Sequence, residues 1–265
     1  MYRRLPLILC YHAVSSVWRT ELAVAETQLA GQLAALRRRG YVGLTFAESE
    51  RARLAGRLPK RTVVVTFDDG FASTSRARPA LEEAGFPGTV FVVTDFVESG
   101  DALSFVPSGS DAEATDELAT DELAPLGWSE LAELRELGWE VGSHTVTHPR
   151  LPDIDSPELQ RELELSRETI ERRLGICETL AYPYGAADER VAAAAAEAGY
   201  LAACTLTGAD RVDERFRRSR VGMYRNDAGL RARAKLSPVG QALRRTGLAE
   251  LAEIRRRRPA RSQAD

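Results

Sequence analysis

The chain has 265 residues, of which 44% are hydrophobic and 28% are charged. This apolar fraction excludes a chain that is disordered throughout, and the length is enough for one large α/β domain or two small ones. Because 36 basic side chains nearly balance 39 acidic ones, the net charge is only −3, and we expect no nucleic-acid partner.

The cysteines and the hydropathy pattern indicate a compartment. Cys10, Cys177 and Cys204 form no CxxC motif, and an odd number of thiols cannot all pair within one chain. The sequence has no run of 18 apolar residues, and the apolar run at 5–10 is too short for a signal peptide. We therefore expect a cytoplasmic protein with reduced thiols.

Short apolar runs alternate with amphipathic stretches along most of the chain. Continuous apolar or β-branched runs predict buried strands, and leucines three or four residues apart predict helices. In chain order, these patterns predict strand 7–14, helix 27–39, strand 62–67, helix 73–84, strand 88–94, helix 129–137, strand 139–143, helix 156–174, strand 179–182, helix 188–198, strand 200–206 and strand 220–224. We expect Ser156 to cap the longest helix and Pro157 to be its first residue. About seven strands, most of them separated by helices, predict a parallel sheet that is open or closed into a barrel.

Two segments depart from this alternation. Residues 98–126 are predicted to form an acidic, flexible insertion in a domain that spans 1–228, since 111–122 holds six acidic residues and no basic one. Residues 229–265 are predicted to form a basic C-terminal helix and tail, with Arg244, Arg245, Arg255, Arg256, Arg257, Arg258 and Arg261. The tail is either a solvated segment or a contact with an anionic membrane surface or an acidic partner.

His144 and His148 are four residues apart, directly after the strand predicted at 139–143. This spacing lets both imidazoles bind one cation, and Thr145 stands where a zincin carries its general-base glutamate. The pair alone is a weak signal, because chance or core packing explains most such pairs.

Asp68, Asp69 and Gly70 follow the strand predicted at 62–67. A polar turn explains this sequence, with Gly70 in a left-handed conformation. Metal-assisted hydrolysis explains it equally well, because one carboxylate can bind a cation while the other accepts a proton from water.

Polar clusters mark the ends of four predicted strands, namely His12, Asp68 with Asp69, His144, and Tyr182-Pro183-Tyr184-Gly185. The carboxyl ends of parallel strands lie on one face of a sheet or barrel, so these residues are expected to meet in one pocket. Packing alone does not readily explain four such clusters.

Three ordered segments carry this pattern, namely Thr66-Phe67-Asp68-Asp69-Gly70, His144-Thr145-Val146-Thr147-His148 and Tyr182-Pro183-Tyr184-Gly185. They resemble the motifs of the polysaccharide deacetylases, the NodB-homology domains of carbohydrate esterase family 4. The similarity runs from about residue 5 to residue 225. It implies a distorted (β/α)7 barrel that hydrolyses an acetamide on an N-acetylated sugar, or an ester in some members.

The resemblance also implies a role for each matching residue. Asp68 would be the general base, and Asp69, His144 and His148 would bind one divalent metal. The backbone N–H of Tyr184 would help to hold the oxyanion. A site of two histidines and one aspartate suits Zn²⁺, with Co²⁺, Mn²⁺, Ni²⁺ or Fe²⁺ as alternatives.

The chain departs from the family pattern in two places. The third motif of the family often has an arginine near the base, where this sequence has Leu180-Ala181-Tyr182, and we expect Arg220 to supply that cation from another strand. No histidine follows His148, so the usual late catalytic acid is absent. His12 is the predicted acid, because Tyr11-His12 resembles a permuted branch of the family, and a core histidine is the alternative.

Two other functions fit part of the pattern. A non-catalytic, glycan-binding member of the same fold would tolerate the missing arginine. An iron oxygenase also uses two histidines and one carboxylate, but such sites usually belong to all-β scaffolds. The leading prediction is a deacetylase of a polysaccharide or glycan precursor, with its oligomeric state open. Most members of the family act on extracellular or wall polymers, whereas this sequence has no evident export signal. A cytoplasmic enzyme that acts on a lipid-linked or small glycan precursor would reconcile the two, with the basic tail near anionic lipid.

Overall fold

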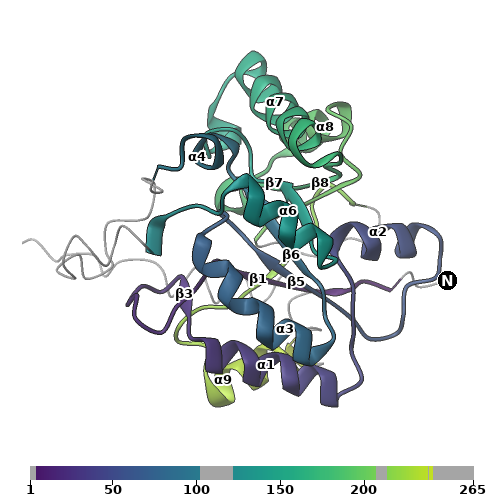
Figure 1. Cartoon of the computed structure of the whole chain (residues 1–265). Coiled ribbons are helices and arrows are strands. Elements are labelled where there is room, and N and C mark those ends of the chain that lie inside the picture. Colours follow the sequence, from purple (N-terminus) through teal and green to yellow (C-terminus); the bar gives the residue numbers. More distant parts are fainter. Residues whose placement is uncertain (1–3, 102–121, 207–213, 238, 241–265) are drawn as a thin grey trace, which may run out of the picture.

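The structure is a computed structural model that describes residues 4–101, 122–206, 214–237 and 239–240. A parallel sheet of eight strands forms its centre (Figure 1). These strands are β1 (Leu7–Tyr11), β4 (Val42–Gly43), β5 (Thr62–Phe67), β6 (Gly88–Val92), β7 (Glu140–Ser143), β8 (Thr179–Ala181), β9 (Ala202–Cys204) and β10 (Val221–Gly222). Their order is β10-β1-β5-β6-β7-β8-β9, with β4 beside β5, and β2 (Ala13–Val14) pairs with β3 (Ala23–Val24) in a small second sheet.

The two ends of the large sheet meet at the segment that leads into β10. Arg218 forms a parallel bridge with Cys204 of β9, and its N–H donates to the carbonyl of Ala203 at 3.0 Å. A few residues later, Val221 of β10 pairs with Leu9 of β1. The segment thus joins both edges, and the predicted distorted (β/α)7 barrel is confirmed.

Helices and short 3-10 turns surround the sheet (Figure 1). The α-helices are α1 (Glu26–Arg38), α2 (Phe46–Leu54), α3 (Arg78–Ala84), α4 (Thr94–Ser99), α6 (Trp128–Glu136), α7 (Ser156–Leu174), α8 (Glu189–Glu197) and α9 (Gly229–Lys235). The 3-10 turns are η1 (Ala72–Ala77), η2 (Leu151–Asp153) and η3 (Pro183–Gly185). No helix of the described segments is long and apolar enough to cross a membrane.

The alternation of side chains along the strands separates two buried clusters. Leu7, Leu9 and Tyr11 of β1 pack in the large cluster, which also contains the leucines of α1 and α7. Ile8, between them, belongs to a smaller cluster with Val64, Phe91, Ala181 and Cys204 from the facing strands, which lies inside the barrel.

Several predicted elements differ from the structure. The first strand is not continuous over 7–14, because it breaks at His12 between β1 and β2. The helix predicted at 73–84 is divided into η1 and α3, since Pro79 has no N–H to continue an α-helical ladder. Helix α2 was not predicted, and α4 occupies the start of the segment expected to be irregular.

The cap of α7 also differs from the prediction. The side chain of Asp155, rather than Ser156, accepts a hydrogen bond from Glu158 N at 2.9 Å. Ser156 is the first helical residue and Pro157 the second. A carboxylate one residue earlier stabilises the helix start equally well, because its charge also interacts favourably with the helix dipole.

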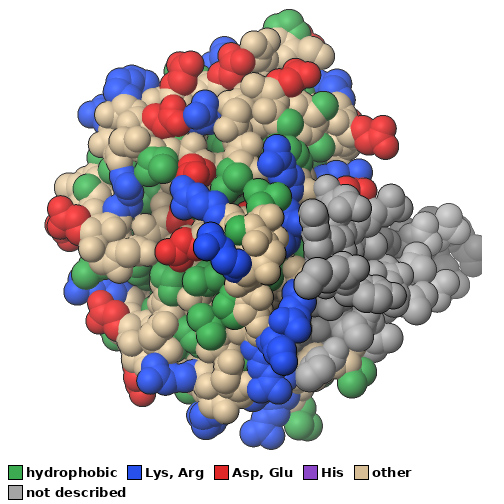
Figure 2. Space-filling view, turned by 90° about the vertical axis from the view of Figure 1, so that its right-hand side faces the viewer, with side chains coloured by type: hydrophobic (Ala, Val, Ile, Leu, Met, Phe, Trp, Pro, Cys, Tyr) green, Lys and Arg blue, Asp and Glu red, His purple; other side chains and the backbone are tan. Residues whose placement is uncertain are grey.

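Charged side chains are unevenly spread over the surface. Figure 2 shows Lys and Arg side chains gathered in a band down one face of the molecule, with Asp and Glu side chains mostly toward its margins. Most of the acidic insertion (102–121) and the arginine-rich tail (241–265) lie outside the described residues, so both stay predictions.

Candidate active site

Residues that follow three strands converge at the carboxyl edge of the barrel. His12 follows β1, Asp68 and Asp69 follow β5, and His144 follows β7. Arg220 precedes β10, and its side chain reaches Asp68. The predicted juxtaposition is therefore present, as expected for parallel strands.

Asp69, His144 and His148 form a compact buried cluster. Asp69 Oδ1 lies 3.4 Å from His144 Nε2 and 3.5 Å from His148 Nε2. The two imidazole centroids are 4.8 Å apart. One carboxylate and two imidazoles in this arrangement could hold one cation.

The hydrogen bonds of His144 show that the cluster fits a divalent metal. Its Nδ1 lies 2.7 Å from the carbonyl oxygen of Ala181, which can only accept, so Nδ1 carries the proton. Nε2 therefore directs a lone pair at Asp69, and two buried acceptors that face each other need a cation or a proton between them. The separations of 3.4 and 3.5 Å also match the spacing of about 3.3 Å between two ligands that bind one Zn²⁺ tetrahedrally at about 2.0–2.1 Å.

The two histidines differ in their affinity for protons. Burial acts to lower the pKa of His144, but its contacts with Asp69, Asp68 and the Ala181 carbonyl together outweigh burial and raise the pKa above its ordinary value. Burial and the neighbouring His144 lower the pKa of His148 to about 3, so this ring is neutral at pH 7. A neutral imidazole is the form that binds metal, and a cation between these groups would take the place of the proton on His144.

Asp68 is held by Arg220 rather than by the histidines. Arg220 donates from both terminal nitrogens to the two carboxylate oxygens of Asp68, at 2.5 and 2.6 Å. It also donates to Thr66 Oγ1 at 3.0 Å and to the carbonyl of Thr205 at 3.1 Å. Burial acts to raise the pKa of Asp68, but the Arg220 guanidinium, together with His144 and His12, outweighs it and holds the pKa well below its ordinary value.

The position of Arg220 matches the expectation that this arginine replaces the one missing from the third motif. Ala181, at the position that departs from the family, belongs to the cluster inside the barrel. Arg220 enters the barrel from the opposite edge strand and its guanidinium lies 5.8 Å from the ring centroid of Phe91. A cation therefore contacts Asp68 although β8 supplies none.

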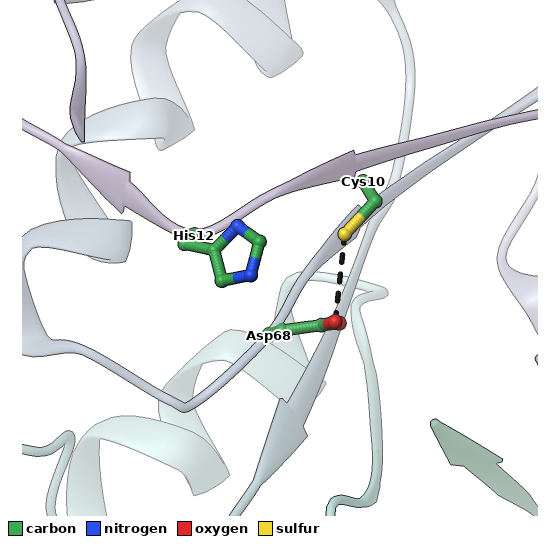
Figure 3. A group of neighbouring side chains, drawn as sticks. All are labelled: Cys10, His12 and Asp68. Carbon is green, nitrogen blue, oxygen red and sulfur yellow. Dashed lines mark hydrogen bonds between the residues drawn. The ribbon is translucent and has the colours of Figure 1, made fainter. Parts of the chain in front are cut away.

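Cys10 is a site residue that the sequence analysis did not identify. Figure 3 shows Cys10 and His12 of the first strand segment pointing toward Asp68. The Cys10 thiol donates to Asp68 Oδ2 at 3.4 Å, and His12 Nδ1 is buried with no hydrogen-bond partner among the described residues. The strand period gave the missing signal, since Cys10 and His12 are two residues apart and share a face. Cys10, His12 and Asp68 thus form a second cluster beside the first. Both oxygens of Asp68 already accept hydrogen bonds from the Arg220 guanidinium, whose positive charge makes this second cluster a poor site for a cation.

Tyr184 lies at the opposite rim of the site. Its ring centroid is 4.7 Å from that of His148, and half of the residue (52%) is exposed. Its backbone is left-handed, with φ 59°. Gly185 is left-handed too, and a Cβ there would lie 2.4 Å from Leu206, so only glycine fits this turn.

Backbone strain is concentrated in this site. Among the described residues, four non-glycine residues have positive φ, namely Asp69, Thr145, His148 and Tyr184. Each such conformation costs about 1–3 kcal/mol and persists where surrounding contacts hold it, which is common at functional sites.

Comparisons with known proteins identify the family. The family model for polysaccharide deacetylase matches residues 55–203, which is more than half of the chain. The chain therefore belongs to the polysaccharide deacetylase family, as its motifs predict. Its class is that of hydrolases acting on carbon–nitrogen bonds other than peptide bonds, which argues against an iron oxygenase.

Individual relatives cover different shares of the chain. It is 26% identical over 221 residues to YxkH of Bacillus subtilis (strain 168), named as a polysaccharide deacetylase, with 82% of this chain and 68% of that protein covered. It is 31% identical over 127 residues to the poly-β-1,6-N-acetyl-D-glucosamine N-deacetylase of Escherichia coli (strain K12), but the match spans 47% of this chain and only 18% of that enzyme.

Solved structures show the same fold. The Streptococcus pyogenes deacetylase PplD, in complex with acetate, has a TM-score of 0.73 at 24% identity, with 88% of this chain and 98% of that chain covered. IcaB from Ammonifex degensii has a TM-score of 0.66 at 25% identity, with 83% and 92% covered.

Proposed function

We propose that this protein is a metal-dependent hydrolase that removes acetyl groups from N-acetylated sugars of a polysaccharide or glycan precursor. The observation that carries the proposal is the placement of two separate carboxylates side by side. Asp69 faces His144 and His148, while Asp68 is kept apart from them by Arg220. One carboxylate is thus available to a cation and the other to a proton.

Asp69, His144 and His148 would hold the cation, and Zn²⁺ suits this set of ligands. When bound, a divalent cation supplies polarisation of the acetyl carbonyl and lowers the pKa of water. Buried, strained backbone at Asp69 and His148 keeps the ligand atoms close together, so little rearrangement is needed on binding.

Asp68 would accept the proton of the attacking water. Its contact with Arg220 keeps it ionised, and the two hydrogen bonds fix the plane of the carboxylate. The thiol of Cys10 fixes Oδ2 from another side. A general base needs this kind of orientation because proton transfer requires a heavy-atom distance near that of a hydrogen bond.

His12 and Tyr184 would complete the chemistry. His12 lies beside Asp68 with an unpartnered buried Nδ1, which suits a group that donates a proton to the leaving nitrogen. The backbone N–H of Tyr184 would donate to the developing oxyanion, and the contact of the Tyr184 ring with His148 places this residue next to the proposed cation site.

The substrate class is supported by sequence similarity. The Escherichia coli relative is named for its action on a polymer of N-acetylglucosamine. Near the site, half-buried Trp18 packs edge-on against Phe71, with ring centroids 5.5 Å apart. Indoles stack well on sugar rings, so the exposed part of Trp18 is a candidate surface for a glycan, whereas Phe71 is buried beneath it.

Acetate release tests the proposal. Purified protein is treated with a chelator and assayed on a panel of N-acetylated glycans, then assayed again after addition of Zn²⁺, Co²⁺ or Ni²⁺. We expect release only after the metal is restored. Glycan binding by the metal-loaded protein, without acetate release from any substrate in the panel, would instead identify a non-catalytic member of the family.

A further inference from the structure

The loop that connects the two histidines of the proposed cation site is held by a carboxylate from α7. Glu162 Oε2 accepts hydrogen bonds from the backbone N–H of Val146 at 2.8 Å and of Thr147 at 3.0 Å. Its other oxygen accepts from Thr147 Oγ1 at 2.8 Å. Glu162 is completely buried, so these contacts are the reason that a charged group can lie there.

The backbone of this loop needs external support. Thr145 and His148 are both left-handed, with φ of 72° and 64°. For a β-branched residue such as Thr145 this conformation is rare, and it persists only where neighbours hold it. One contact is internal, since Thr145 Oγ1 accepts from the N–H of His148 at 3.1 Å.

The remaining support comes from two helices on either side. The first residues of α4 donate to the loop carbonyls, with Thr94 N bonded to Thr145 O and Asp95 N to Val146 O, both at 3.1 Å. Glu162 is the acceptor for the N–H groups of Val146 and Thr147, while Ser143 Oγ accepts from the N–H of Thr145 at 3.1 Å. Val146 is buried, and a buried N–H that loses its acceptor is costly. The charged neighbours of Glu162 are Arg161, 3.4 Å away and mostly exposed, and the carboxylate of Asp95 at the start of α4.

We propose that Glu162 is a positioning residue that sets the separation and direction of His144 and His148 for binding one divalent cation. It touches neither imidazole and acts through the backbone of the loop between them. The inference rests on the proposed function, because it assumes that these histidines bind a cation. Partners of metal ligands commonly tune affinity in this way, and their loss weakens binding about 10–100-fold.

Cation affinity tests the inference. Glu162→Gln places an amide NH₂ against one of the loop donors, whereas Glu168→Gln changes an exposed glutamate of the same helix and is the matched control. Affinities for Zn²⁺ are measured by competition with a chromophoric chelator, and the visible absorption of the Co²⁺ form reports the ligand geometry. We expect Glu162→Gln to bind about 10–100-fold more weakly with an altered Co²⁺ spectrum. The control should match the wild type.

Two further variants test whether the effect comes from the position of the Glu162 carboxylate, and not from its charge or from a loss of folding. Glu162→Asp keeps the charge but shortens the reach, so it should also weaken binding, and wild-type affinity in this variant would overturn the inference. Thr147→Val removes one of the three hydrogen bonds from an exposed residue and keeps the fold. It should weaken binding about threefold or more, and unchanged affinity would also overturn the inference. If the wild type binds no cation, the proposed function itself fails, whereas equal binding by wild type and Glu162→Gln defeats only the role of Glu162.

Discussion

The guanidinium of Arg220 forms a two-point ion pair with the carboxylate of Asp68, which lies 152 residues earlier in the chain. Both side chains are buried, and the pair is planar enough for each carboxylate oxygen to receive its own donor. In a buried pair of this kind, removal of one partner leaves an uncompensated charge. The pair therefore links the stability of the barrel to the orientation of the proposed base.

Replacement of Arg220 should affect both properties. We expect Arg220→Ala to lower the free energy of unfolding by about 3–5 kcal/mol, because Asp68 loses its buried partner. Arg220→Lys keeps the positive charge but loses the pair of parallel donors of the guanidinium. It should therefore be more stable than Arg220→Ala and still lose turnover. Denaturant titration and acetate release measure the two effects. Intact activity in Arg220→Ala would remove the arginine from the proposed mechanism.

Exchange of each aspartate for asparagine should separate the two carboxylates. Asp68→Asn should lose turnover by about 10²–10⁴-fold, as expected for a general base, and keep cation affinity. Asp69→Asn should lose cation affinity as well, because Asp69 faces both imidazoles. Turnover is measured by acetate release and affinity by chelator competition. Weakened cation binding in Asp68→Asn would contradict the division of roles.

His12→Ala should lose most turnover while it retains the metal. The ring lies beside Asp68 but outside the cluster formed by Asp69, His144 and His148. A substrate with a better leaving group should recover part of the rate, since it needs less help from an acid. Unchanged turnover on the ordinary substrate would assign His12 to the core instead.

Metal removal should lower thermal stability. A cation that binds only the folded protein stabilises it by about 2.7 kcal/mol when its concentration is 100 times the dissociation constant. We expect chelation to lower Tm and Zn²⁺ to restore it, with no response in His148→Ala. Thermal unfolding followed by circular dichroism measures the shift. A wild-type Tm that is indifferent to chelator and metal would argue against a cation at this cluster.

The three thiols should resist alkylation in the native protein. Burial raises the pKa of Cys10 and Cys177, and it raises the pKa of Cys204 to about 12. The thiolate is the reactive form, so little of it exists at pH 8. Mass spectrometry after iodoacetamide treatment should find no label in the folded protein and three labels after unfolding. Labelling of a thiol in the native protein would show that the surrounding structure opens enough to expose that thiol to the reagent.

The sequence predicts which side chains meet at the carboxyl ends of the strands, but it does not predict every helix. His12, Asp68 and His144 were placed together correctly because strand period and parallel pairing determine where carboxyl ends lie. Arg220 was also expected near Asp68. The contact of Cys10 was not predicted. The strand period places Cys10 on the same face as His12, but a buried cysteine within a hydrophobic strand has the same pattern as a core residue, so the facing strand is needed to show its contact with Asp68.

Helix α2 shows why some elements could not be predicted. Its buried residues include Glu50 and Arg53, which a sequence pattern assigns to a solvated surface. Glu50 in fact accepts hydrogen bonds from Arg53 at 2.9 Å and from Arg218 at 3.1 Å. A charge can be buried only with such partners, and Arg218 is 168 residues away in sequence. Long-range ion pairs of this kind leave no local signal.

The closure of the barrel by the segment leading into β10 has a practical consequence for protein fragments. A fragment cut at the limits of the family match, 55–203, would keep Asp69 and both cation-facing histidines. It would lack β1 with His12 and the segment that carries Arg220, so Asp68 would have neither its ion-pair partner nor the imidazole beside it. Such a fragment would also expose the free edges of β5 and β9, which invite association between copies. Expression boundaries for this protein should therefore follow the closure of the sheet and not the extent of recognisable motifs.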